Sequence, residues 1–88
     1  MNKHVLLVLK WLKNPDSVSR EEIDEHYESL EYPVFHGSPE YELETAYFNI
    51  DLSYICDDLQ ECIDETKECI DEYFRLSGEN RADYEKAI

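Results

Sequence analysis

The chain has 88 residues, and its 22 aspartates and glutamates against 8 lysines and arginines give a formal charge of −14 at pH 7. Nucleic acids and anionic membrane surfaces both attract clustered basic side chains, so this balance excludes direct binding to either. The length predicts a single helical domain over residues 1–88, and the 42% hydrophobic content predicts that it folds. No apolar run approaches the roughly 20 residues that span a bilayer.

Two short helices are predicted in the first third of the chain. The first runs from His4 to Lys13 and is apolar except for a narrow lysine face; it stops before Asn14, because the residue before a proline avoids the helical conformation. Ser19, with Glu22 three residues later, predicts a capping box that starts the second helix, which extends to about residue 30.

A long acidic amphipathic helix is the main predicted element. After a loop over residues 32–40 that contains proline and glycine, the apolar spacing is helical from Tyr41 to Leu76. We expect one helix over at least Leu52–Leu76, although residues 41–47 also alternate well enough for a strand. Its heptad a/d row consists of Leu52, Ile55, Leu59, Cys62, Thr66, Cys69, Tyr73 and Leu76, and Cys56, Ile63 and Ile70 widen it.

The last residues predict a helix end and a further short helix. Gly78 is a typical residue after a helix C-terminus, and Asn80 is a typical N-cap for a helix that runs to Ile88. The predicted fold class is therefore all-α, with three to four helices. The wide apolar stripe also predicts a homodimer, because a second copy would bury it.

The three cysteines all fall within the predicted long helix. Cys62 and Cys69 would lie two turns and about 10.5 Å apart, beyond the roughly 7 Å limit for a disulfide. The cysteines and histidines do not show the spacing that is typical of zinc sites. We therefore expect buried thiols in a reducing cytoplasm, and the alternative is a disulfide between the helices of a dimer.

The acidic residues are concentrated in one part of the chain. Residues 1–20 carry +3, residues 21–66 carry −15 without a single lysine or arginine, and residues 67–88 carry −2. Crowded carboxylates repel one another, so a binding function explains them better than folding does. Eight of them, the acidic row, share the face opposite the apolar stripe: Asp57, Asp58, Glu61, Asp64, Glu65, Glu68, Asp71 and Glu72.

The spacing of the acidic row predicts how it binds. Neighbours three or four residues apart lie about 5–6 Å from one another, a step comparable to the phosphates of a DNA strand. The row therefore predicts a binding site for a basic, DNA-binding partner. A merely solvated acidic surface is the alternative. Acidification is expected to stabilise the fold, because protonation of carboxylates with raised pKa values relieves repulsion.

Other kinds of site find less support. Acid–base catalysis by paired carboxylates needs a dry pocket that a small core does not supply. Glu22 and His26 are one turn apart and could ligate a metal, but a histidine on a helix face is more often structural. No twelve-residue calcium loop is present. We therefore expect neither an enzyme nor a metal or cofactor site.

Three segments carry a resemblance to phage proteins: residues 5–12 (VLLVLKWL), Asp57–Glu72, and the ending from Tyr73 to Arg81 with Tyr84. The chain resembles the small, highly acidic early proteins of tailed phages that mimic DNA, the antirestriction inhibitors of the Arn and Ocr type. The resemblance implies an inhibitor that occupies the DNA-binding surface of a restriction, nucleoid-associated or other defence protein in the host cytoplasm. The alternative is a helical adaptor or immunity-type protein that binds one basic partner through Tyr32, Phe35 and nearby acids.

Overall fold

The computed structural model describes residues 1–30 and 35–88, whose regular secondary structure is helical with no strand among them. These described residues contain five α-helices and one 3₁₀ turn, in the order α1 (Lys3–Lys13), η1 (Pro15–Ser17), α2 (Arg20–Ser29), α3 (Pro39–Leu52), α4 (Leu59–Ser77) and α5 (Arg81–Glu85). The predicted all-α class is confirmed, with five helices instead of three to four. Within these described ranges, no helix combines the length and apolarity needed to cross a membrane.

The predicted helix ends are largely where the capping residues place them. Ser19 Oγ accepts a hydrogen bond from the Glu22 amide at 3.2 Å, which starts α2. Gly78 ends α4 with a φ of +73°, in the left-handed region that favours glycine. Asn80 caps α5, which stops at Glu85 and not at the predicted residue 88. The predicted loop over residues 32–40 falls partly outside the described residues. α3 begins at Pro39, before the predicted end of that loop.

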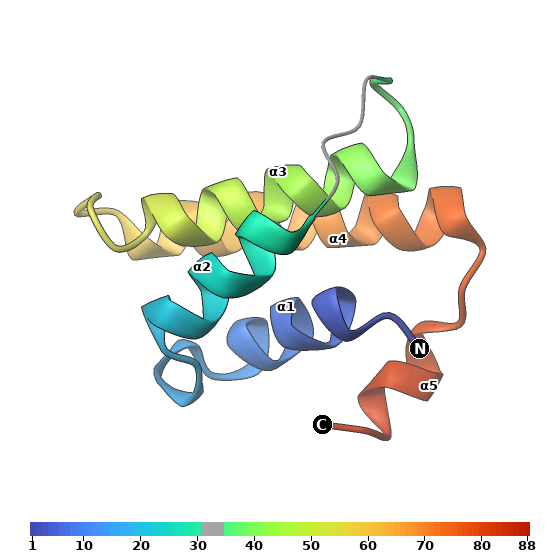
Figure 1. Cartoon of the computed structure of the whole chain (residues 1–88), viewed down its shortest axis with the longest axis horizontal. Helices are drawn as coiled ribbons and strands as arrows, with labels where there is room; N and C mark the ends of the chain where they lie inside the picture. The colour runs from blue at the N-terminus through green and yellow to red at the C-terminus, as the bar shows by residue number, and fades with distance from the viewer. Residues whose placement is uncertain (31–34) are drawn as a thin grey trace.

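The single helix expected over Leu52–Leu76 is wrong. α3 ends at Leu52, the chain turns through residues 53–58, and α4 then lies beside α3 as a helical hairpin (Figure 1). Asp58 Oδ1 accepts a hydrogen bond from the Glu61 amide at 3.0 Å and so starts α4. Aspartate is unfavourable in a helix interior and is a strong N-cap. Asp58 therefore marks the break between the two helices, although the apolar spacing around it is continuous.

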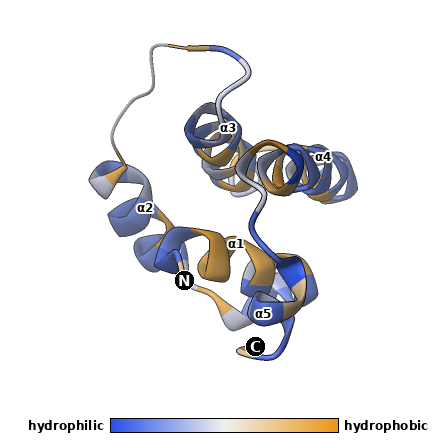
Figure 2. Ribbon diagram, turned by 90° about the vertical axis from the view of Figure 1, so that its right-hand side faces the viewer, coloured by the Kyte–Doolittle hydropathy of each residue, from blue (hydrophilic) through white to orange (hydrophobic). Residues whose placement is uncertain are grey.

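α1 supplies the largest share of the core. Its buried side chains are Val5, Leu7, Val8, Leu9 and Trp11, while its three lysines are exposed as predicted. α3 contributes Leu43, Ala46, Tyr47 and Ile50, and α4 contributes Cys69, Ile70 and Tyr73. Figure 2 shows the hydrophobic colour concentrated on α1 and on adjoining parts of α3 and α4.

Tyrosine hydroxyls fasten the two ends of the described chain to this core. Tyr47 Oη donates to the His4 carbonyl oxygen at 2.6 Å and ties α3 to α1. Tyr84 Oη accepts from the Asn2 amide at 3.0 Å and donates to Glu79 at 2.6 Å. Tyr73 also donates to Glu79, so one carboxylate joins α4 to α5.

Candidate functional site

The two faces of α4 separate buried residues from acidic ones. The buried side chains are Cys62, Thr66, Cys69, Ile70 and Tyr73, all of them predicted for the inward stripe. They pack within the chain, where α4 contacts α3 and α1. The part of the stripe from Cys62 to Tyr73 is therefore already covered within the chain, and the homodimer stays a prediction without support from that part.

The first part of the predicted stripe does not face the core. Ile55 is 72% exposed, Leu59 is also exposed, and Cys56 is exposed and not buried as expected. Ile55 and Cys56 lie in the turn over residues 53–58, outside the helical register, and Leu59 is the first residue of α4. Apolar side chains therefore stand in solvent beside the first acids of the row.

Seven residues of the acidic row are exposed, and the eighth, Glu72, is half-buried. Asp57 and Asp58 lie in the turn before α4, and the other six lie on α4 itself. The 19 residues of α4 extend over about 28 Å. The structure therefore places six members of the row along the solvent-facing side of α4 and the other two in the adjoining turn.

The N-terminal end of the row has a partly structural role. Asp58 is the N-cap of α4, and negative charge near a helix N-terminus is stabilised by the helix dipole. Asp64 Oδ1 accepts a hydrogen bond from the side-chain amide of Gln60, Nε2, at 3.0 Å, and this neutral donor leaves the negative charge of Asp64 in place. Among the described residues, no ion pair neutralises six members of the row, the unpaired acids: Asp57, Asp58, Glu61, Asp64, Glu65 and Glu68.

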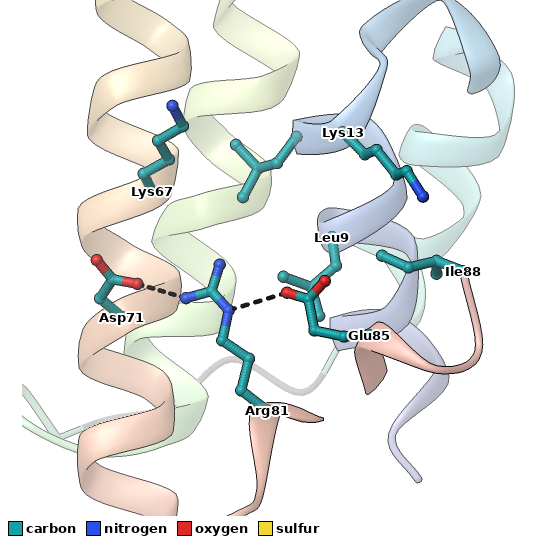
Figure 3. Close-up of a pocket in the computed structure, with 8 residues that line it drawn as sticks. Leu9, Lys13, Lys67, Asp71, Arg81, Glu85 and Ile88 are labelled. Carbon is teal, nitrogen blue, oxygen red and sulfur yellow. Dashed lines mark hydrogen bonds and ion pairs between the residues drawn. The ribbon is translucent and has the colours of Figure 1, made fainter. Parts of the chain in front are cut away.

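The C-terminal end of the row is neutralised by two arginines. Arg75 holds Glu72 through two short contacts, Nε–Oε1 at 2.9 Å and Nη2–Oε2 at 2.6 Å. Arg81 of α5 holds Asp71 at 2.6 Å and Glu85 at 3.3 Å, as Figure 3 shows. These pairs reduce the negative field at this end, so the acidic row is electrostatically uneven.

The pKa directions differ from those expected for a uniformly repelling row. The Arg75 guanidinium lowers the pKa of Glu72 by hydrogen bonding to its carboxylate. Raised carboxyl pKa values occur instead at Glu42, through burial and then the charge of Glu72, and at Asp51, through burial and then its hydrogen bond with Asp24. The expectation of a raised pKa is therefore wrong at Glu72.

A second charged cluster joins α2 to α3 and was missed in the sequence. Arg20 Nε lies 3.8 Å from Asp24 and 3.6 Å from Asp51, and its guanidinium lies over the Tyr54 ring. Arg20 and Asp24 are one turn apart on α2, but Asp51 and Tyr54 come from α3 and the turn after it, so local spacing reveals only the first pair. The available signal was the position of Arg20 as the last cation before a 46-residue stretch without any.

The candidate metal pair, Glu22 and His26, is not joined by further ligands. His26 Nδ1 lies 3.0 Å from His4 Nδ1, and the two rings meet edge to face. Burial, followed by the neighbouring His26, lowers the pKa of His4. In the part of the chain that the structure describes, no three His, Cys, Asp or Glu side chains are grouped to hold a metal ion.

The aromatic patch of the adaptor hypothesis, Tyr32 and Phe35, lies only partly within the described residues. Phe35 is 72% exposed, which suits a partner contact. Tyr32, its predicted companion, lies outside the described residues. Comparisons with known proteins add nothing to either hypothesis: no family model, no curated protein and no solved structure matches this chain.

Proposed function

We propose that this protein inhibits a DNA-binding protein by covering its basic surface with the acidic row. The observation that carries the proposal is the combination of a 46-residue stretch without cations and an outward α4 face whose acids are exposed. A helix about 28 Å long matches roughly eight base steps of duplex DNA. Its carboxylates can therefore occupy sites that otherwise hold phosphates.

The unpaired acids carry most of the proposed binding. Ion pairs with Arg75 and Arg81 already neutralise Glu72 and Asp71, so a partner gains less from contacting them. The six unpaired acids offer charge that no described cation neutralises. Because association through many charges releases counterions, affinity should fall steeply with salt, and duplex DNA should displace the inhibitor.

The test compares two variants with the same change in net charge. The first, D57N/E61Q/E65Q/E68Q, neutralises four unpaired acids without touching the buried stripe or the Asp58 cap. The control, E21Q/E25Q/E28Q/E40Q, neutralises four exposed acids of α2 and α3. A basic partner captured from a host lysate and eluted by duplex DNA supplies the ligand for titration with both variants.

The expected result is a loss of at least tenfold in affinity for the first variant and a much smaller loss for the control. Equal losses would show that only total charge matters, and an unchanged affinity in the first variant would contradict the proposal. Circular dichroism and urea unfolding confirm that both variants remain folded.

A patch-binding adaptor is the second candidate, favoured by the exposure of Phe35. Such a protein depends on a few anchor side chains, so Phe35→Ala should cost ~2 kcal/mol or more of binding free energy. The quadruple acid variant should then bind almost normally. Salt dependence separates the two candidates, because an anchored patch is less sensitive to ionic strength than a distributed field.

A further inference from the structure

The turn between α3 and α4 brings together two cysteines that an unbroken helix would separate. In one continuous helix, Cys56 and Cys62 would lie about 9 Å apart along the axis and on different faces. Instead, the Cys56 amide donates to the Leu52 carbonyl oxygen at 3.0 Å and closes the end of α3. Cys62 lies in the first turns of α4, after the chain has reversed direction.

The two cysteines lie at the same end of the hairpin, and Cys56 is among the groups that act on the Cys62 thiol. Both also line one cavity of about 250 Å³ at this end of the hairpin, together with Asn49, Leu52, Glu61 and Glu65. Cys56 is exposed, whereas Cys62 is only 4% exposed, so one thiol faces solvent and the other lies behind it.

We propose that Cys56 and Cys62 form a reversible disulfide when the protein meets a small organic disulfide. The exposed Cys56 thiolate attacks one sulfur of the oxidant, whose S–S bond breaks and releases one thiolate that takes a proton from water. Cys62 then loses its proton to solvent and attacks Cys56 Sγ, which releases the second thiol. Two protein thiols are oxidised, and one small disulfide is reduced to two thiols.

The environment sets the order of these steps. Burial, followed by the nearby Cys56 and the acids Glu61 and Asp58, raises the pKa of Cys62, so the exposed cysteine reacts first. Cys69 is a built-in control, because it is buried and its pKa is raised to about 11. It lies two helical turns beyond Cys62 and is contacted by Asn49 at 3.8 Å.

The surrounding acids should also select the oxidant by charge. Asp57 and Asp58 lie between the two cysteines in sequence, and Glu61 and Glu65 line the shared cavity. Like charges slow an encounter and opposite charges speed it. A cationic disulfide such as cystamine should therefore react about tenfold faster or more than anionic glutathione disulfide at low salt. High salt should reduce this ratio.

The experiment treats the full, reduced chain with cystamine and maps its peptides by mass spectrometry without reduction. We expect the chain to lose the mass of two hydrogen atoms, to show a Cys56–Cys62 linkage, and to recover on addition of a dithiol. Cys69→Ser should behave like the unaltered chain, and Cys62→Ser should stop at a mixed disulfide on Cys56.

Three outcomes would overturn the proposal: a lasting mixed disulfide on the unaltered chain, a linkage to Cys69, or a covalent dimer. Equal low-salt rates for the two oxidants would overturn the selection by charge. Mapping the unaltered chain does not depend on how well any variant folds. The result is also independent of the proposed inhibitory function, because no partner takes part.

Discussion

α4 contains one five-residue sequence twice, and the two copies lie in different surroundings. The segment Glu-Cys-Ile-Asp-Glu occupies residues 61–65 and again 68–72. Ile70 is completely buried, whereas Ile63 is only half-buried. The copies share the same local propensities, so the difference comes from what packs against them. The second copy reaches α1 and α5, where Asp71 lines a cavity with Leu9 and Arg81 (Figure 3).

The acids of the two copies differ in the same way. Asp71 is held by Arg81 and Glu72 by Arg75, while Asp64 receives only a neutral amide and Glu65 has no ion pair among the described residues. One copy therefore serves mainly to stabilise the fold. The other leaves its charge available to a partner, which is why the proposed binding surface lies toward the hairpin turn.

The largest expected effect concerns the two isoleucines. Ile70→Ala should lower the free energy of unfolding by ~2–5 kcal/mol, because it removes a fully buried side chain and leaves a cavity. Ile63→Ala should cost less than about 2 kcal/mol, because its side chain is partly in water already. Urea unfolding of both variants measures the difference, and equal losses would contradict the unequal burial of the two copies.

The two aspartates should differ less strongly. Asp71→Asn removes an ion pair between α4 and α5, but Asp71 is 66% exposed, so the expected loss is only ~0.5–1 kcal/mol. Asp64→Asn should leave stability unchanged or slightly raise it, because it removes charge from a strongly acidic protein. Unfolding at low and high salt tests the pair: the loss for Asp71→Asn should shrink at high salt, and a loss that does not would rule out an electrostatic origin.

The smallest effect is a pH dependence at Glu72. Its pKa is lower in the folded protein than in the unfolded chain, so its contribution to stability is present above the unfolded value of about 4.3. That contribution is lost as the pH falls through the folded value. NMR titration should show the Glu72 pKa rising in Arg75→Gln. An unchanged midpoint would mean that Arg75 does not hold this carboxylate in solution.

Sequence reasoning located the helix ends that depend on a single capping residue. Ser19, Gly78 and Asn80 act within one turn of their own position, so local chemistry suffices to place them. Asp58 is a cap of the same kind, but the continuous apolar spacing around it favoured an unbroken helix. Three/four spacing placed the six acids that lie on α4 along its solvent-facing side, but it wrongly put Asp57 and Asp58 on the same helix, since both lie in the turn before it.

The amino-acid sequence by itself determined the helical class, the caps, the inward stripe of α4 and the segregation of charge along the chain. These features depend on backbone preferences and side-chain periodicity, which act over a few residues. Only the tertiary structure decided which acids are neutralised, which copy of the repeat is buried, and that Cys56 lies beside Cys62. Arg81 reaches Asp71 from another helix, and the two cysteines meet across a turn. Such contacts exist only after the chain has reversed direction and packed, because no periodic pattern encodes them.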